Sequence, residues 1–150
     1  MEQVIIYTDG GVRGNHQREN VGGWGAVLKY GPHVKELYNG VRNTTNNRME
    51  IKAVIEALKA MKKYNIPVVV HSDSAYVVNC MNNKWYQKWR NNGWMTSANK
   101  PVENREMWME LIDLVEKFSF ITFVKVKGHS GNELNELADR LANKGMDMLS

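Results

Sequence analysis

Two aspartates in this sequence each close an apolar run, a position where a carboxylate can do chemistry. Asp9 ends the run that begins at Gln3 and precedes a glycine pair, and Asp73 ends the run that begins at Val68. Solvation does not require an acid there, and the irregular backbone after a strand leaves room for a ligand. Each aspartate also has a plainer interpretation, as a turn residue or, for Asp73, as the N-cap of a helix.

Two further acids border the apolar faces of predicted helices. Glu50 lies one turn before Val54, and Asp139 lies beside a stripe of leucines and alanines. A glutamate in the first turn of a helix also interacts favourably with the helix dipole, so a purely structural role for Glu50 stays open. Four gathered carboxylates would repel one another unless cations lay between them. All-oxygen ligation suits Mg²⁺ or Mn²⁺ rather than zinc, and two such ions about 3.5–4 Å apart can hydrolyse a phosphodiester.

A short loop with glycine on both sides holds His129, ten residues before Asp139. We expect this imidazole to carry protons rather than to bind metal, since four carboxylates already suit hard cations. Ser130 and Glu133 have the spacing of a capping box, which predicts that they begin the last helix.

The positive charge is concentrated in one part of the chain. The net charge is +4, and residues 74–102 contain no Asp or Glu but contain Lys84, Lys88, Arg90 and Lys100. Tryptophans 85, 89 and 94 lie in the same stretch, which we call the basic segment (residues 84–94). Aromatic faces beside cations suit sugars and bases flanked by phosphates, so Trp85 and Trp89 are predicted ligand contacts. Trp94 and Trp108 are expected in the core.

The elements that must position these residues follow from hydrophobic periodicity. The sequence predicts strands at 3–9, 21–30, 33–43, 68–73 and 120–126, and helices at 46–64, 74–83, 84–93, 102–117 and 132–144. Lys62 and Lys63 are expected in the last turn of the first helix, and Gly145 at the C′ position of the last. The order β-β-β-α-β-α-α-α-β-α predicts a mixed sheet covered by helices, an α/β fold.

Length and composition limit the class of protein. A chain of 150 residues is expected to form a single domain over residues 1–150. Its one cysteine, Cys80, excludes an intramolecular disulfide and a cysteine-rich zinc site. No secretion leader and no membrane-spanning run are found in the sequence, so a cytoplasmic protein is expected.

Five separated motifs occur in a familiar order: "YTDGG", "TTNNRMEIKAVIEAL", "HSDSAYV", the basic segment and "VKGHSGNELNELADRLA". Together they resemble the type 1 cellular ribonucleases H, the bacterial ribonuclease HI group, from about Val4 to Ala142. The resemblance implies the ribonuclease H-like fold, a five-stranded mixed sheet flanked by helices with a basic helical protrusion. It also implies an endonuclease that hydrolyses the RNA strand of RNA·DNA hybrids and leaves 5′-phosphate and 3′-hydroxyl ends.

The resemblance assigns roles residue by residue. The four metal-binding carboxylates would be Asp9, Glu50, Asp73 and Asp139, which would hold two Mg²⁺ ions, with Mn²⁺ able to substitute. His129 would assist proton transfer or release of the cleaved phosphate. The implied substrate contacts are Asn15, Thr45, Asn46, Asn47, Lys84, Trp85, Lys88, Trp89, Arg90 and Asn104. Short polar side chains of this kind can recognise the 2′-hydroxyl of RNA. The expected partner is the hybrid alone, bound by a monomer without membrane contact.

Some positions depart from the pattern of this family. The loop from Gly10 to Gly22 is longer and more charged than usual, and Gly11 replaces a frequent serine. Ala75 stands where a glutamine often contacts the hybrid, and Asn43 where a basic residue often reaches a phosphate. These changes concern substrate contacts rather than chemistry, and the role of Glu136 stays open.

Three alternatives remain at this point. An integrase- or resolvase-like nuclease would share the fold and the metals but cut DNA, which the "TTNNRME" motif and the basic segment disfavour. The nuclease domain of a reverse transcriptase is disfavoured by a start at Met1 without polymerase sequence. A non-catalytic hybrid-binding module would tolerate the loss of a carboxylate, and none is lost.

Overall fold

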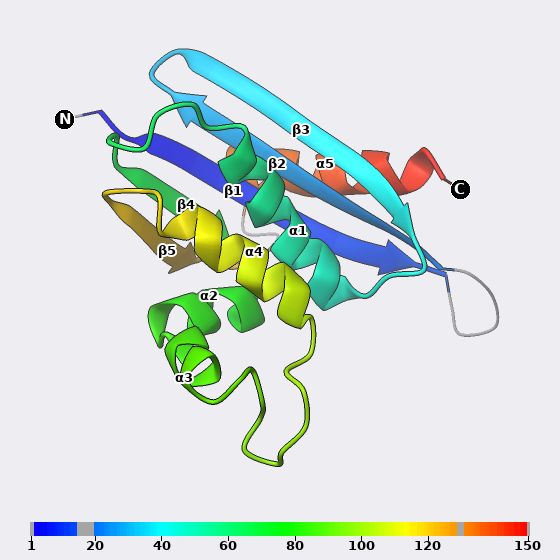
Figure 1. Cartoon of the computed structure of the whole chain (residues 1–150). Helices are drawn as coiled ribbons and strands as arrows, with labels where there is room; N and C mark the ends of the chain where they lie inside the picture. Colours follow the sequence, from blue (N-terminus) through cyan, green and yellow to red (C-terminus); the bar gives the residue numbers. More distant parts are fainter. Residues whose placement is uncertain (1, 15–19, 129–130, 150) are drawn as a thin grey trace.

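The computed structural model describes residues 2–14, 20–128 and 131–149 (Figure 1). Its elements have the predicted order. They are β1 (Val4–Arg13), β2 (Val21–Tyr30), β3 (His33–Arg42), α1 (Asn46–Lys59), β4 (Val68–Ser72), α2 (Ala75–Asn82), α3 (Trp85–Asn91), α4 (Arg105–Val115), β5 (Ile121–Lys125) and α5 (Glu133–Asp147).

The strands form one five-stranded sheet in the order β3-β2-β1-β4-β5. β2 is antiparallel to both β1 and β3, whereas β4 is parallel to both β1 and β5. The sheet is therefore mixed, as the sequence predicts. β1 is longer than expected, because the residues from Gly10 to Arg13 continue to pair with β2.

Helices cover both faces of the sheet (Figure 1). α1 and α4 lie on one face, where Ile6, Ile55 and Trp108 are fully buried in the main core. α5 lies on the other face and packs Leu141 against Val27 of β2 in a smaller cluster. α3 and the chain that leads from it to α4 project from this body. No helix of the described residues is long and apolar enough to cross a membrane.

The ends of two helices and the cap of one differ from the prediction. α1 ends at Lys59 with Ala60 as its C-cap, so Lys62 and Lys63 follow the helix instead of forming its last turn. The N-cap of α5 is Asn132, the first residue of the predicted helix, and its Oδ1 accepts hydrogen bonds from two backbone N–H groups at 3.0 Å. Ser130 lies outside the described residues. Gly145 lies inside α5 rather than after it, where the backbone of β3 approaches too closely for a side chain.

Candidate active site

Four elements bring the four predicted carboxylates to one end of the sheet. β1 and β4 run in parallel and pair Thr8 with Ser72, so the next residue of each chain segment, Asp9 and Asp73, emerges at the same place. Glu50 lies in the first part of α1 and Asp139 in the middle of α5. The ligand oxygens of Asp9, Glu50 and Asp73 all lie within 4.8 Å of one another. We call these four residues the carboxylate cluster.

Two glycines allow the helices to approach the sheet at this point. A Cβ on Gly10 would lie 2.6 Å from the backbone nitrogen of Glu50, and a Cβ on Gly25 would lie 2.5 Å from the carbonyl oxygen of Ala138. Neither distance is compatible with a side chain. Gly10 thus allows α1 to pack close to β1. Gly25, which pairs with Asp9 from β2, allows α5 to pack close to β2.

The carboxylate cluster lines an open cavity of about 430 Å³. Asn46, Asn47 and Ala75 also line it, as do Gly10, Ser74 and Tyr76. Asp73 does not act as an N-cap, because the hydroxyl of Ser74 accepts the hydrogen bond from the N–H of Val77 at 3.2 Å. The plainer interpretation of Asp73 as a helix cap therefore does not apply.

Burial and mutual repulsion change the acidity of this site. Burial raises the pKa of Asp9 to about 8, and the neighbouring carboxyls of Asp73 and Asp139 add to the effect. Burial also raises the pKa of Glu50 to about 10, with further contributions from Asp9 and Asp73. Within the described part of the chain, the buried Oε1 of Glu50 has no hydrogen-bond partner. A site of this kind is unfavourable for carboxylates alone and favourable for carboxylates that share cations.

Two predicted site residues, His129 and Asn15, lie outside the described residues. The chain that leads to His129 passes beside the cluster, since a Cβ on Gly128 would lie 3.0 Å from Oδ2 of Asp73. Glu136 is half-buried in the first turn of α5 and does not line the cavity.

A polar network joins the start of α1 to the start of α4. Thr45 is the N-cap of α1 and accepts a hydrogen bond from the N–H of Arg48 at 3.2 Å. The Arg48 guanidinium donates to Oδ1 of Asn104 at 3.3 Å. Trp108 donates to the hydroxyl of Tyr76 at 2.9 Å, and Asn104 donates to the same oxygen at 3.4 Å. Thr45 and Asn104 are thus neighbours through Arg48.

Sequence reasoning missed Arg48. A signal was available, because a cation in the first turn of a helix opposes the helix dipole and needs another reason to be there. An exposed guanidinium between a threonine and an asparagine can bind a phosphate through two parallel hydrogen bonds.

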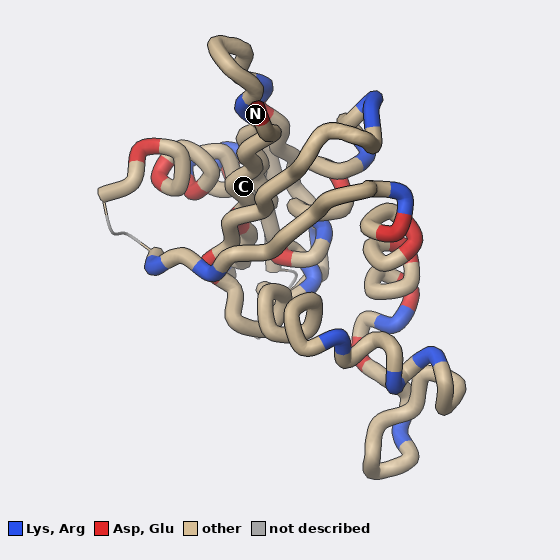
Figure 2. Tube along the Cα trace, turned by 90° about the vertical axis from the view of Figure 1, so that its left-hand side faces the viewer, with Lys and Arg blue, Asp and Glu red and all other residues tan. Residues whose placement is uncertain are grey.

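The basic segment projects from the body of the protein, and Lys and Arg residues are spaced along it (Figure 2). Trp85 and Lys88 line a shallow cavity of about 280 Å³ together with Trp89. Trp85 is exposed, whereas Trp89 is half-buried and its ring lies 6.5 Å from that of Trp85, 5.9 Å from that of Trp94 and 6.0 Å from that of Trp108. Trp89 therefore also connects the segment to the core, where Trp108 is fully buried as expected.

Arg90, which is predicted as a substrate contact, also has a partner within the protein. Its guanidinium donates two hydrogen bonds of 2.8 Å to the carboxylate of Glu116 in a bidentate pair. This arrangement joins α3 to the end of α4 and leaves the guanidinium less available to a phosphate.

Comparisons of the sequence with a family model and with known proteins indicate the same family. The family model described as RNase H matches residues 1–147. The chain is 50% identical over 147 residues to a ribonuclease H of Clostridium botulinum, covering 98% of this chain and 97% of the relative. It is 46% identical over 149 residues to a ribonuclease HI of Neisseria meningitidis, covering 99% of each.

Solved structures agree with the sequence relatives. LC9-RNase H1, described as a type 1 RNase H with the type 2 active-site motif, has a TM-score of 0.85 and 30% identity, over 99% of this chain and 74% of that one. LC11-RNase H1, solved in complex with an RNA/DNA hybrid, has a TM-score of 0.73 and 27% identity, over 99% of this chain and all of that one. The match over nearly the whole chain, together with the fold, shows that this protein belongs to the ribonuclease H family of hydrolases.

Proposed function

We propose that this protein cleaves the RNA strand of RNA·DNA hybrids at the carboxylate cluster and leaves 5′-phosphate and 3′-hydroxyl ends. The observation that carries the proposal is the convergence of Asp9, Glu50, Asp73 and Asp139 from four separate elements on one open cavity. The hybrid-bound LC11-RNase H1 supports the choice of substrate.

The residues present fit divalent cations. Among the described His, Cys, Asp and Glu residues, those that come together here are carboxylates, and the buried Oε1 of Glu50 has no hydrogen-bond partner among the described residues. We assign the cluster to two Mg²⁺ ions, which Mn²⁺ can replace. When bound, such ions supply an activated water and stabilise the leaving oxygen. The role of the protein is to hold the four carboxylates at fixed positions through β1, β4, α1 and α5.

Asn46 and Asn47 are proposed to recognise the RNA strand. Both are exposed on the first turn of α1 and line the same cavity as the carboxylates. Their amide groups can donate to and accept from a 2′-hydroxyl in a shallow minor groove. Asn15 is proposed to contribute to the same recognition.

The DNA strand is proposed to lie along two further sets of residues. Thr45, Arg48 and Asn104 form one phosphate site at the junction of α1 and α4. Lys84, Trp85, Lys88 and Trp89 form the other, where cations meet phosphates and the exposed face of Trp85 meets a sugar. Arg90 holds α3 in place rather than contacting the hybrid.

His129 is proposed to move a proton at the cleaved phosphate or to assist its release. It directly follows Gly128, where a Cβ would lie 3.0 Å from Oδ2 of Asp73. An imidazole is suited to proton transfer near neutral pH.

Cleavage assays on three matched duplexes test the proposal. With Mg²⁺ and RNA labelled at either end, we expect cutting of the hybrid and no cutting of double-stranded RNA or duplex DNA. The fragments should carry 5′-phosphate and 3′-hydroxyl termini, and a chelator should stop the reaction. Equal cutting of duplex DNA would show that the substrate is assigned wrongly.

We further propose that residues 1–150 act as one domain, as a monomer and in the cytoplasm. A specific activity that does not change with protein concentration, and a single species in analytical ultracentrifugation, are the expected results for a monomer.

A further inference from the structure

One asparagine joins the beginning of β2 to the connection between β3 and α1 (Figure 1). Asn20 directly precedes β2, and Asn43 and Thr44 directly follow β3. The ladder of β2 and β3 ends at the pair of Val21 with Arg42. One step further, the carbonyl of Asn20 accepts a hydrogen bond of 3.0 Å from the N–H of Asn43. Asn20 therefore extends the pairing of the two strands beyond their ends.

The side chain of Asn20 continues this pairing in place of a peptide group. Its Nδ2 donates to the carbonyl oxygen of Thr44 at 2.9 Å, and its Oδ1 accepts from the N–H of Thr44 at 2.9 Å. Thr44 is 6% exposed, so both of its backbone groups need partners inside the protein. An amide side chain can satisfy both, because it offers a donor and an acceptor side by side.

The position of Thr44 depends on its backbone rather than on its hydroxyl. The buried Oγ1 of Thr44 has no hydrogen-bond partner among the described residues. Its methyl group packs against Gly22, where a Cβ would overlap it. The preceding residue, Asn43, has a φ of 55°, a left-handed conformation that interrupts the strand. Within the described part of the chain, the hydrogen bonds that hold Thr44 beside β2 are thus those with Asn20.

Thr44 directly precedes the residues that are proposed to recognise the hybrid. Thr45 is the N-cap of α1, and Asn46 and Asn47 line the same cavity as the carboxylates. Holding Thr44 in place therefore fixes the point at which the chain enters α1 and presents these three side chains.

The catalytic carboxylate of α1 is held by other contacts. Glu50 is buried, and its backbone lies so close to Gly10 that a side chain on Gly10 would collide with it. The helix continues into the main core through buried residues from Ile51 to Leu58. Loss of the contact at Asn20 should therefore affect the binding of substrate and not the chemical step.

We propose that Asn20 is a positioning residue for recognition of the hybrid. This inference rests on the function proposed above: Asn20 acts through Thr44 and holds Thr45, Asn46 and Asn47 where they meet the two strands. The connection is then ordered when the protein folds and need not be ordered when the substrate binds, which lowers KM.

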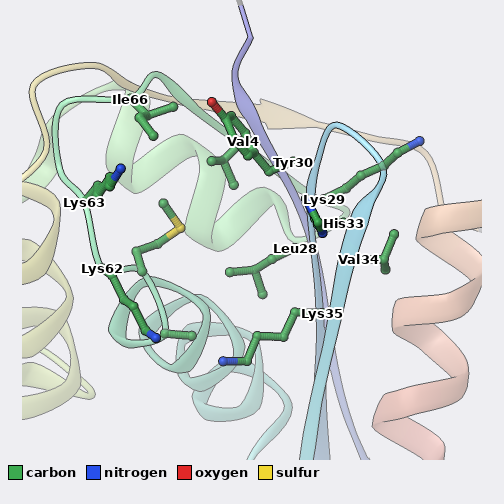
Figure 3. A pocket seen from close by; sticks show the side chains of 12 residues that line it. Val4, Leu28, Lys29, Tyr30, His33, Val34, Lys35, Lys62, Lys63 and Ile66 are labelled. Atoms are coloured by element: carbon green, nitrogen blue, oxygen red, sulfur yellow. The ribbon is translucent and has the colours of Figure 1, made fainter.

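Hydrogen exchange tests the contact, and hybrid cleavage tests its role. In Asn20→Ala, the N–H of Thr44 should exchange at least about tenfold faster than in the parent protein, as measured by NMR. KM for the hybrid should rise about fivefold, with kcat within about twofold of the parent. Asn65→Ala is the matched control and should change none of these quantities. Asn65 is exposed and precedes Ile66, which lines a hollow beside the turn of the β2–β3 hairpin, at the other end of the ladder from Asn20 (Figure 3).

Combined substitutions show whether Asn20 acts through the connection. When Asn46 and Asn47 are both replaced by Ala, the further change Asn20→Ala should raise KM by no more than about twofold, because the side chains that it positions are absent. In Lys88→Ala, the effect of about fivefold should remain, because Lys88 lies on a separate helix, α3. A purely structural role would lower the unfolding temperature without this difference between the two backgrounds.

Asn20→Asp is a second variant for the case that Asn20→Ala does not fold. Aspartate has the shape of asparagine and still accepts from the N–H of Thr44, but it cannot donate to the carbonyl. We expect KM to rise by at least about twofold. Asn65→Asp adds the same charge elsewhere and should leave KM unchanged.

Several outcomes would overturn the inference. They are an unchanged exchange rate of the Thr44 N–H in Asn20→Ala, an unchanged KM in the folded Asn20 variants, a loss of kcat in place of a rise in KM, and an undiminished effect of Asn20→Ala when Asn46 and Asn47 are replaced. Failure of the parent protein to cut the hybrid would overturn the proposed function and this inference with it. Cleavage by the parent protein with an unchanged KM in Asn20→Ala would overturn this inference alone.

Discussion

The carboxylate cluster and the basic segment are opposites in almost every physical respect. In the cluster, acids of one sign are packed together, partly or fully buried, and fixed by strand pairing and close helix contacts. In the basic segment, Lys84 and Lys88 are exposed, the first at the N-cap of a helix of seven residues and the second within that helix, which has no buried residue. The first region has a high electrostatic cost that bound cations would offset, and the second has almost none.

The difference shows how one small domain separates chemistry from affinity. Positions in the cluster must be accurate, because small displacements of reacting groups have large effects on rate. Phosphate contacts tolerate movement, because an ammonium on a flexible stem attracts a polyanion over a range of positions. Substitutions in the two regions should therefore affect different measurements, and by different amounts.

The largest effect is expected from Asp9→Asn. We expect turnover to fall by about a thousandfold, because the amide cannot replace the charge of a ligand at the centre of the cluster. Binding of the hybrid, measured by anisotropy without turnover, should change by less than about threefold. Asp113→Asn is the matched control, since the side chain of Asp113 is exposed and distant from the cavity. Activity of Asp9→Asn within tenfold of the parent would contradict the role given to this residue.

Gly10→Ala tests whether close contact between α1 and β1 fixes the cluster. The new Cβ would collide with the backbone at Glu50, so we expect the free energy of unfolding in urea to fall by about 2–3 kcal/mol, with a loss of activity. Gly11→Ala is a control on the same strand, where the nearest atom outside the immediate neighbours lies at 3.7 Å. Its effect on stability should stay within about 0.5 kcal/mol. Equal stability of the two variants would argue against the proposed contact.

The stability of the metal-free protein should decrease as pH rises. The folded state raises the pKa of Asp9 to about 8 and that of Glu50 to about 10, from 3.8 and 4.5. At pH values between the pKa of the unfolded state and that of the folded state, the folded protein binds more protons than the unfolded protein. The stabilisation that is present below pH 4 is therefore lost as the pH increases. In a chelator, we expect the free energy of unfolding to decrease continuously from pH 5 to pH 8, because over most of this interval both carboxyls are protonated in the folded state and ionised in the unfolded state.

The same measurement distinguishes the two regions. Asp9→Asn should flatten the pH dependence, whereas Lys88→Ala should leave it unchanged. Addition of Mg²⁺ at pH 8 should restore stability, because cations favour the charged carboxylates. A free energy of unfolding that increases with pH in the chelator would contradict the raised pKa values of Asp9 and Glu50.

The smallest effect is expected from Lys88→Ala. We expect hybrid affinity to fall severalfold and the slope of log affinity against log salt to decrease by about 1, with turnover at saturation unchanged. Lys117→Ala, outside the basic segment, should change neither quantity. A large loss of turnover in Lys88→Ala would contradict the proposal that the basic segment contributes to binding of the hybrid and not to its cleavage.

Much of this arrangement could be predicted from the sequence because it rests on strong local patterns. Apolar runs that end at Asp9 and Asp73 marked two buried strands, and the order of elements followed from the change of hydrophobic period. The convergence of these two residues with Glu50 required the parallel pairing of β1 with β4, which the α/β order favours but does not specify.

The errors came where tertiary contacts decide between equivalent local choices. The apolar period of α1 continues to Met61, yet the chain leaves the helix after Lys59 in order to reach β4. Serine and asparagine are both good N-caps, so sequence could not rank Ser130 above or below Asn132. Asn132 also donates to the hydroxyl of Tyr7 on β1, a contact between distant parts of the chain. The pairing of Arg90 with Glu116, twenty-six positions away, is a further contact that local sequence patterns do not predict.

Asp9 and Asp139 come from near opposite ends of the chain, and this has a consequence for the protein during its synthesis. β1 leaves the ribosome before the other elements of the sheet, whereas α5 emerges after all of them. Until then β2 and β3 lack the helix that covers their outer face, and the fourth carboxylate is absent. A chain that ends before α5 thus lacks one of the four carboxylates, and the cluster can form only after α5 has packed onto the sheet.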